Sequence, residues 1–434
     1  MYTVGLYTLG CKVSQYETEA IAEEFLRHGF RVLPFDEICD AYVINTCTVT
    51  AESDRKSRQM IRRATGRSRD AIVAVVGCYS QRDSQSILSI PGVSIVLGTD
   101  SKLSVVGKVK DMLDSHTRAS FCSISDLSQA LFEPMTVTRA PRTRAYVKIE
   151  DGCECRCTYC AIADARGRVR SKPRADVIDE VERLYAAGTR EIVLTGIETG
   201  SYGKDFDCEY TLADLILELD RRHSCDRIRL GSLAPELVGH SFTEKIKNAG
   251  ILAPHFHISM QSGSDRVLRM MRRRYTRESA LRNIQWLREA IPQAGFTTDL
   301  MVGFPGETEE DFLMSCDFVR EAGLLDAHVF AYSRRSGTAA ALYDGQIDES
   351  VKHRRSKELI SVVKEVRDSI LDTITEQGEP LSVILEDMHD GMYTAHSASY
   401  VEMKVTAPDG MTGELVYAVP VSHKDGIVYG YLQK

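Results

Sequence analysis

Short apolar runs alternate with amphipathic stretches over most of the chain, and this alternation restricts the possible folds more than any other feature. In the first block the apolar runs fall at residues 3–9, 41–46, 71–77 and 94–98. Residues 15–30 carry apolar side chains three and four positions apart, which predicts an amphipathic helix. Strands that alternate with helices build parallel sheets. We therefore predict an open parallel α/β sheet as the N-terminal domain, residues 1–116.

A second and longer block of alternation follows. Its apolar runs fall at residues 145–150, 191–195, 227–231, 256–260, 297–302 and 326–331. Six β/α units predict a partial (β/α)6 barrel, two units short of the full eight. A doubly wound sheet is the competing architecture. Most of the long amphipathic stretch at 351–378 completes this central domain, which we place at residues 145–375.

Two further segments interrupt the alternation. Residues 117–144 lose periodicity and predict a linker between domains. After Pro380 the chain changes to short apolar runs separated by Gly and Asp-Gly turns, which is typical of a small all-β module. We place this module at residues 376–434 and expect an α/β protein overall.

Three cysteines lie within eight residues of one predicted loop: Cys153, Cys157 and Cys160, spaced C-x3-C-x2-C. Three thiolates on one loop can bind three corners of a [4Fe–4S] cluster and leave the fourth iron open. A structural zinc site is the alternative, because Cys155 would supply the fourth ligand that zinc requires. Disulfides are disfavoured, since an intracellular chain keeps its cysteines reduced.

Three more cysteines occupy equivalent positions in the first domain. Cys11, Cys47 and Cys78 each come directly after, or within two residues of, the end of a predicted strand. Ligands of open parallel sheets bind outside the carboxyl ends of the strands. These three thiols therefore predict a second metal site, although a single cysteine in an apolar setting is more often part of the core.

The overall composition excludes some classes of protein. No apolar run approaches the ~20 residues that span a bilayer, and residues 1–12 have no features of a signal peptide. We therefore expect a cytoplasmic protein with no membrane partner. The net charge of −8 argues against a generally basic surface. Local Arg and Lys clusters at residues 54–69, 165–174 and 266–277 still predict RNA contact, with solvated helix faces as the alternative.

Both cysteine sets resemble those of the radical S-adenosylmethionine methylthiotransferase family, and the resemblance extends over essentially the whole chain. The segments TLGCKVSQYETE, INTCTVTAESDRKSRQMIRRA and VVGCYSQ are most similar to the subgroup that acts on threonylcarbamoyladenosine in tRNA. The three domains resemble the family's N-terminal module, radical domain and TRAM domain. The chain departs from the family at Ala163 and Asp164, where proline is usual, and at Gly231, where serine is usual.

This resemblance implies two [4Fe–4S] clusters and S-adenosylmethionine as cofactors. The open iron of the Cys153, Cys157 and Cys160 cluster would bind S-adenosylmethionine, and an electron from an electron-donor protein would release a 5′-deoxyadenosyl radical. The Cys11, Cys47 and Cys78 cluster would carry sulfur from a sulfur donor. The implied substrate is the tRNA anticodon loop, in which carbon 2 of the modified adenosine would receive a methylthio group.

Candidate S-adenosylmethionine contacts lie at the carboxyl ends of the predicted barrel strands, where barrel enzymes hold their substrates. They are Glu198, Ser232, Gln261, Asp299 and Gly303. His255 and His257 lie on the fourth predicted barrel strand and His328 lies on the sixth, but we interpret them as hydrogen-bonded structural residues and assign no general acid or base.

Two other functions are compatible with these motifs. One is a methylthiotransferase that modifies a ribosomal protein side chain. The other is an iron–sulfur RNA-binding protein that performs no radical step.

Overall fold

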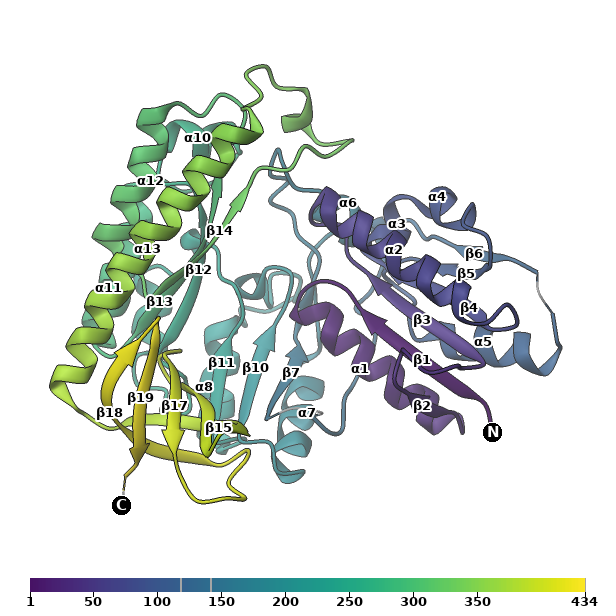
Figure 1. Ribbon diagram of the computed structural model, residues 1–434, viewed down its shortest axis with the longest axis horizontal. Coiled ribbons are helices and arrows are strands. Elements are labelled where there is room, and N and C mark those ends of the chain that lie inside the picture. The colour runs from purple at the N-terminus through teal and green to yellow at the C-terminus, as the bar shows by residue number, and fades with distance from the viewer. Residues whose placement is uncertain (118, 141–142, 434) are drawn as a thin grey trace. The chain divides into compact units, whose positions relative to one another are not determined.

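The computed structural model describes residues 1–117, 119–140 and 143–433, traced in Figure 1 from the N-terminus to the C-terminus. The chain forms two compact units. The first combines residues 1–137, 146–172 and 333–341, and the second combines residues 138–145, 173–332 and 342–434. In the described part of the chain, no helix is long and apolar enough to cross a membrane. The domain boundaries expected from the sequence stay a prediction.

A six-stranded sheet forms the centre of the first unit. Its strands are β1 (Thr3–Thr8), β2 (Arg31–Leu33), β3 (Ala41–Thr46), β4 (Ile72–Gly77), β5 (Val93–Leu97) and β6 (Phe121–Ser123). They lie in the order β2-β1-β3-β4-β5-β6, and every neighbouring pair is parallel. The predicted open parallel sheet is confirmed. The sequence reasoning missed β2 and β6, because three-residue runs show no measurable periodicity.

Helices cover both faces of this sheet. Ile21 of α1 (Lys12–Arg27) and Val109 of α5 (Ser104–Asp114) pack in one apolar cluster. Ile61 of α2 (Ala51–Arg67) and Ile87 of α4 (Ser84–Leu88) pack in another. All residues of β3 and β4 are buried, which explains why their apolar runs are continuous. The remaining elements of this unit include α3 (Cys78–Arg82), β8 (Glu150–Asp151), α6 (Ile162–Arg166) and β9 (Arg170–Ser171).

The second unit contains an arc of parallel strands. They are β10 (Glu191–Thr195), β11 (Arg227–Leu230), β12 (His255–Gln261), β13 (Gly295–Val302) and β14 (Asp326–Ala331), and β7 (Arg144–Lys148) lies next to β10. A bridge between Leu233 and Ile258 joins β11 to β12. The strands therefore follow their order in the sequence, whereas a doubly wound sheet reverses its order near the middle. The partial (β/α)6 barrel is confirmed, and the doubly wound alternative is wrong.

Helices follow the strands of this arc. They are α7 (Arg174–Ala186), α8 (Leu212–Arg222), α9 (His240–Ile246), α10 (Asp265–Met270), α11 (Arg277–Ala290), α12 (Glu309–Ala322) and α13 (Glu349–Gln377). Local sequence sets their ends, as α12 illustrates. Thr308 Oγ1 accepts the Asp311 N–H at 3.2 Å, and Asp311 Oδ2 accepts the Thr308 N–H at 2.8 Å. Gly323 then ends the helix with a φ of 57°.

The last five strands close into a small barrel. They are β15 (Leu381–His389), β16 (Met392–Ser397), β17 (Glu402–Thr406), β18 (Leu415–Lys424) and β19 (Ile427–Leu432), in the order β15-β16-β17-β19-β18. The predicted all-β, TRAM-like module is confirmed. The sequence reasoning missed β16, whose inward side chains Tyr393, Ala395 and Ser397 are too mixed in polarity to show an alternating pattern.

Buried ion pairs connect this small barrel to the parallel strands. The Glu191 carboxylate on β10 lies 2.9 Å from Arg229 Nε, 3.1 Å from Arg227 Nη1 and 2.9 Å from Arg144 Nε. We call these four residues the Glu191 cluster. Arg229 also donates to the carbonyls of Ser397 and Ala398, each at 3.0 Å. The end of β16 is thereby fixed to β11 through a buried arginine.

Candidate iron–sulfur centre

The loop that carries Cys153, Cys157 and Cys160 is closed at its base. β8 and β9 pair in antiparallel fashion, and the Cys153 N–H donates to the Gly167 carbonyl at 3.0 Å. Gly152 has a φ of 94°, and a Cβ at this position would lie 1.8 Å from the Arg168 carbonyl oxygen. Only glycine therefore fits directly before the first cysteine.

The three thiols of this loop differ in exposure. Cys157 is buried, whereas Cys153 and Cys160 are half-buried, and none of the twelve cysteines, all of which lie in the described part of the chain, is in a disulfide. A hydrogen bond with Cys155, burial and the neighbouring thiol charges raise the pKa of Cys153. Cys160 Sγ accepts the Ile162 N–H at 3.4 Å. A cationic metal cluster favours the ionised form of the thiols that bind it.

The second set lies at the carboxyl ends of three neighbouring strands, β1, β3 and β4. Cys11 is exposed and forms the N-cap of α1, Cys47 directly follows β3, and Cys78 begins α3. Cys47 and Cys78 are buried. The topology therefore places these three cysteines at one edge of the sheet, as their positions after predicted strands suggested.

The backbone near Cys11 and the Cys47 side chain come close together. A Cβ added to Gly10 would lie 3.0 Å from Cys47 Cβ and 3.3 Å from Cys47 Sγ. Burial, followed by repulsion from ionised Cys78 and Cys11, raises the pKa of Cys47 to about 11. Ionised neighbours in the set therefore disfavour ionisation of Cys47, as in a site that needs metal to hold its thiolates.

Both cysteine sets belong to the first unit. Among the residues that the structure describes, no three Cys, His, Asp or Glu side chains lie close enough together to hold one metal ion. The assignment of the six cysteines as cluster ligands stays a prediction. Its chemical basis is the donor set: three cysteines on one closed loop and three at one sheet edge, none of them in a disulfide.

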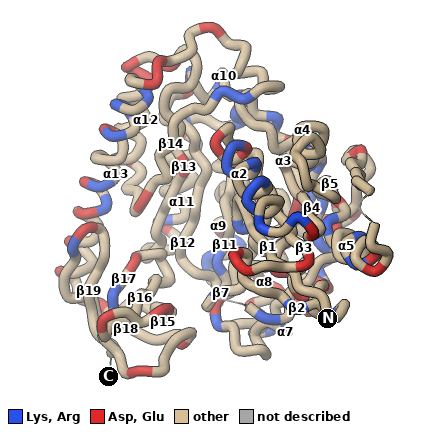
Figure 2. The backbone as a smooth tube through the Cα atoms, turned by 45° about the vertical axis from the view of Figure 1, so that its right-hand side comes forward, with Lys and Arg blue, Asp and Glu red and all other residues tan. Residues whose placement is uncertain are grey.

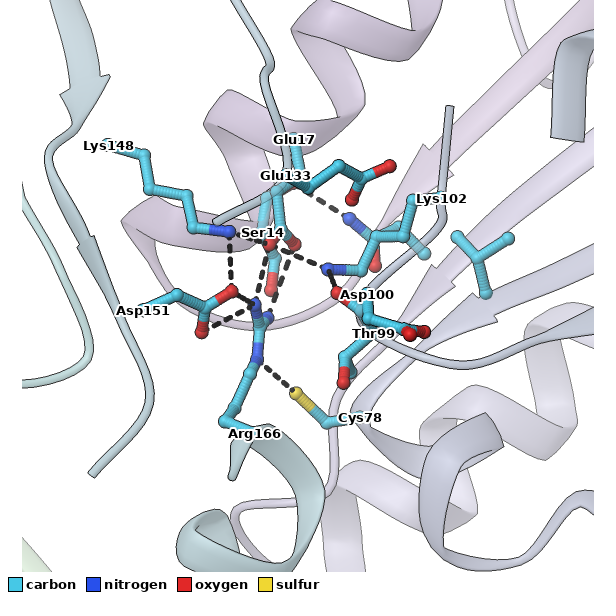
Figure 3. Close-up of polar contacts among 12 residues, drawn as sticks. Ser14, Glu17, Cys78, Thr99, Asp100, Lys102, Glu133, Lys148, Asp151 and Arg166 are labelled. Atoms are coloured by element: carbon cyan, nitrogen blue, oxygen red, sulfur yellow. Dashed lines mark hydrogen bonds and ion pairs between the residues drawn. The ribbon is translucent and has the colours of Figure 1, made fainter. Parts of the chain in front are cut away.

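Charged side chains lie beside Cys78, as Figure 3 shows, and these side chains are buried. Glu17 Oε1 on α1 lies 2.7 Å from Lys102 Nζ and 2.9 Å from Lys148 Nζ. Arg166 Nη1 lies 2.5 Å from the same oxygen and 3.2 Å from Asp151 Oδ2. Lys148 Nζ also lies 2.6 Å from Asp151 Oδ2. We call Glu17, Lys102, Lys148, Asp151 and Arg166 the Glu17 cluster.

The cations of this cluster keep its carboxylates ionised. Burial alone would raise the pKa of Glu17, but Arg166, Lys102 and Lys148 outweigh burial and hold the pKa well below its usual range. The pKa of Asp151 is lowered in the same way, chiefly by Arg166 and Lys148. Arg166 also reaches the second cysteine set, since its Nε donates to Cys78 Sγ at 3.1 Å.

The sequence reasoning missed the Glu17 cluster. The composition of residues 165–174 predicts a basic surface, yet Arg166, Arg170 and Lys172 are buried. Their cationic groups bind carboxylates and carbonyls inside the unit. A signal was present, because Lys148 interrupts an apolar strand and Glu17 lies on the apolar stripe of a helix. Charges at such positions indicate buried partners.

The five candidate S-adenosylmethionine contacts lie in the second unit. Gln261 ends β12, the other candidates except Asp299 lie one to three residues after strands β10, β11 and β13, and Asp299 lies within β13. Glu198 Oε1 accepts the Ala234 N–H at 3.1 Å, and Ser232, two residues after the end of β11, is exposed. Gln261 and Asp299 are on the neighbouring strands β12 and β13. The ladder between these strands shifts register just before Gln261, which has a φ of 71°. A residue other than glycine in this region is strained, and such strain concentrates at functional sites.

Asp299 and Gly303 are held by named partners. His257 Nε2 lies 3.1 Å from Asp299 Oδ2, and His328 Nδ1 lies 3.4 Å from Oδ1. Burial opposes ionisation of Asp299, but these two histidines lower its pKa. The Gly303 N–H donates to Glu307 Oε2 at 2.7 Å. The role of these residues in binding S-adenosylmethionine stays a prediction.

Comparison with known proteins first identifies the class of the chain. The Radical SAM superfamily model matches residues 147–319, and the model described as uncharacterized protein family UPF0004 matches residues 3–98. The solved structure of the radical S-adenosylmethionine methyltransferase TsrM from Kitasatospora setae aligns with a TM-score of 0.56. That alignment covers 79% of this chain and 77% of TsrM at 17% identity, so it shows the fold alone. The fold is that of a radical S-adenosylmethionine protein.

Relatives with higher identity define the family. Threonylcarbamoyladenosine tRNA methylthiotransferase MtaB of Bacillus subtilis is 38% identical over 96% of this chain and 93% of its own length. MtaB of Thermotoga maritima is 38% identical over 84% of this chain and 82% of its own. The chain belongs to the radical S-adenosylmethionine methylthiotransferase family, as its cysteine segments predicted. Membership implies a [4Fe–4S] cluster and S-adenosylmethionine.

Proposed function

We propose that this protein adds a methylthio group to carbon 2 of N6-threonylcarbamoyladenosine next to the tRNA anticodon. The observation that carries the proposal is the presence of two three-cysteine sets in one compact unit. The likeness to MtaB over 96% of the chain supports this substrate, and the tRNA substrates named for the relatives favour RNA over a ribosomal protein.

The six cysteines would hold two [4Fe–4S] clusters with separate tasks. Cys153, Cys157 and Cys160 would hold the cluster that binds S-adenosylmethionine and supplies a radical able to attack an unactivated C–H bond. Cys11, Cys47 and Cys78 would hold the cluster that carries the donated sulfur. An electron-donor protein and a sulfur donor are then required partners.

The chain's own residues would position these groups and exclude water from them. Gly152 and the β8–β9 pair close the cysteine loop, and the left-handed backbone at Gln261 fixes the end of β12. Gly303 has a φ of 70°, and a Cβ there would lie 2.3 Å from Lys352 Cγ, so glycine is strongly favoured at the end of β13.

The RNA contact would come from α2. This helix begins four residues after Cys47, and Figure 2 shows Lys and Arg along it. Arg55, Lys56 and Arg62 are exposed there. Phosphates bound by these side chains would lie near the second cysteine set, and an unpaired anticodon-loop base can leave its stack to be modified. We place the enzyme in the cytoplasm with its tRNA substrate.

Nucleoside mass spectrometry of tRNA tests the proposal. Cells that lack the protein should lose the 2-methylthio mark from threonylcarbamoyladenosine, and the parent protein should restore it. Cys157→Ala and Cys47→Ala should not restore the mark, because each removes one ligand of one cluster. Cys208→Ala is the matched control: this exposed cysteine lies outside both sets, so the mark should return.

Two results would contradict the proposal. If the mark persisted without the protein and no other enzyme made it, the substrate assignment would be wrong. If reduced, reconstituted protein released no 5′-deoxyadenosine from S-adenosylmethionine, the radical step would be absent. The iron content of the protein can also be measured, and two [4Fe–4S] clusters predict about eight iron atoms per chain.

A further inference from the structure

Arg166 makes contacts that join the two cysteine sets. It lies six residues after Cys160, at the end of α6, and none of its side chain is exposed. Its Nε donates to Cys78 Sγ at 3.1 Å, while its Nη1 lies 2.5 Å from Glu17 Oε1. Glu17 is on α1, the helix whose N-cap is Cys11. The Arg166 guanidinium therefore binds Cys78 of the second set and also binds α1, the helix that begins at Cys11 of the same set.

The carboxylates around Arg166 fix its direction. Nη1 is shared between Glu17 and Asp151, and Nη2 lies 3.2 Å from Glu17 Oε2. A guanidinium presents its donors in a rigid fork, so binding both Nη groups aims the Nε–H as well. Asp151 comes two residues before Cys153, so the same guanidinium also binds the segment that leads into the first cysteine loop. The donor to Cys78 is thus held in place by both cysteine-bearing segments.

The charges of the Glu17 cluster do not cancel. Four buried cations, Lys102, Lys148, Arg166 and Arg170, face the carboxyl groups of Glu17, Asp151 and Glu133. Even with all three carboxyl groups ionised, the balance is 4 − 3 = +1. Cys78 Sγ is the acceptor that the Arg166 Nε–H faces. A buried positive charge is costly unless an anion balances it.

We propose that Arg166 is a positioning residue of the second cluster, where its Nε–H hydrogen bond and buried charge hold the Cys78 thiolate and raise the cluster's reduction potential. This inference rests on the proposed function, which assigns Cys11, Cys47 and Cys78 to a cluster. Reduction adds an electron to the cluster, and hydrogen bonds to its sulfur ligands stabilise the added charge. By contrast, Cys11 Sγ lies 3.8 Å from the neutral hydroxyl of Ser14.

The test measures the potential of the second cluster by itself. Full-length protein carrying Cys153→Ala, Cys157→Ala and Cys160→Ala, reconstituted anaerobically, keeps only the second cluster, with about four irons per chain. Redox titration followed by EPR then reports its potential. Arg166→Lys in this background keeps a cation beside Glu17 and Asp151 but removes the Nε–H donor. Arg27→Lys is the matched control, because Arg27 is exposed at the far end of α1.

Arg166→Lys should keep its iron and become harder to reduce. Losing one charge-assisted hydrogen bond should lower the ratio of reduced to oxidised cluster about tenfold at a fixed potential, which is a downward shift of about 59 mV for one electron. Arg27→Lys should leave the potential unchanged. A merely structural role of Arg166 would change stability and would not move the potential in this direction.

An unchanged potential in Arg166→Lys with four irons bound would overturn the role of Arg166 and leave the proposed function intact. If the background protein itself bound no iron and gave no EPR signal, the second cluster, and with it the proposed function, would fail. Should Arg166→Lys not fold, Glu17→Gln with Arg166→Gln removes one carboxylate and one guanidinium together. The same titration of that variant should show the same shift, and its absence would overturn the inference.

Discussion

Two clusters in this protein each place three cations around buried carboxylates, but the remaining arginine N–H groups of the two clusters have different acceptors. In the Glu17 cluster three cations surround two carboxylates, and the Arg166 Nε–H that remains is donated to Cys78 Sγ. In the Glu191 cluster three arginines surround one carboxylate, and Arg144 has Glu386 as a second anionic partner. Arg229 donates its remaining N–H groups to backbone carbonyls of Ser397 and Ala398. The two clusters therefore differ in the group that accepts the remaining arginine N–H: a cysteine sulfur in the Glu17 cluster and carbonyl oxygens in the Glu191 cluster.

That difference separates a structural cluster from one placed for chemistry. Carbonyl oxygens are permanent partners, so the Glu191 cluster is complete when the small barrel has folded. A thiol is a full partner for Arg166 only when it is ionised, as a cluster ligand would be. The Glu17 cluster is therefore expected to affect iron binding and redox behaviour, and the Glu191 cluster to affect stability alone.

The largest expected effect comes from Glu191→Ala. It leaves Arg144, Arg227 and Arg229 without their shared carboxylate, and breaking a buried ion cluster costs about 3–5 kcal/mol. Trp286 is the chain's single tryptophan and lies on α11, so its fluorescence in guanidinium chloride reports the second unit. Glu278→Ala, a substitution at an exposed residue of the same helix, should leave the guanidinium chloride concentration at the midpoint of unfolding unchanged. A loss below about 1 kcal/mol for Glu191→Ala would show that the cluster does not support the unit.

Acid should weaken the second unit through the same carboxylate. Burial opposes ionisation of Glu191, but Arg229, Arg144 and Arg227 lower its pKa to about 2. An unfolded glutamate has a pKa of about 4.3. Because the folded pKa is depressed, the stabilisation is complete above about pH 4.3 and is lost as the pH falls towards 2.

The measurement compares the parent with Glu191→Gln at two pH values. The difference in their free energies of unfolding, followed by Trp286 fluorescence, should shrink by about 2 kcal/mol between pH 6 and pH 3. Other carboxylates titrate in this range, and taking the difference between the two proteins removes their contribution. If the difference between the two free energies of unfolding were the same at pH 6 and pH 3, Glu191 would not be the cause of the acid sensitivity.

The sequence predicted what is local and periodic. The six barrel strands and the main strands of the first sheet follow from apolar runs, and the C-x3-C-x2-C loop is contiguous. The positions of Cys11, Cys47 and Cys78 also followed, because parallel topology brings the carboxyl ends of neighbouring strands to one edge. Each of these inferences needs only the order of residues and one rule of geometry.

Long-range charge pairing could not be predicted in the same way. Glu17, Lys102, Lys148 and Arg166 are far apart along the chain, and each charge alone is compatible with an exposed surface. Arg166 in particular lies in a basic segment whose composition indicates a surface for RNA, yet it is buried. Only the packing of α1 and α6 in the folded unit identifies its partners.

The smallest expected effect, and the most direct comparison, is the same substitution in the other cluster. Arg229→Lys keeps the charge beside Glu191 but gives up hydrogen bonds to Ser397 and Ala398, which should cost about 1.5 kcal/mol in the Trp286 transition. The potential of the second cluster should not change, because the Arg229 donors end on carbonyls and not on sulfur. Arg166→Lys should instead change the reduction potential of the second cluster and leave the Trp286 transition unchanged. If both variants changed the potential equally, the acceptor would not be what distinguishes the two clusters.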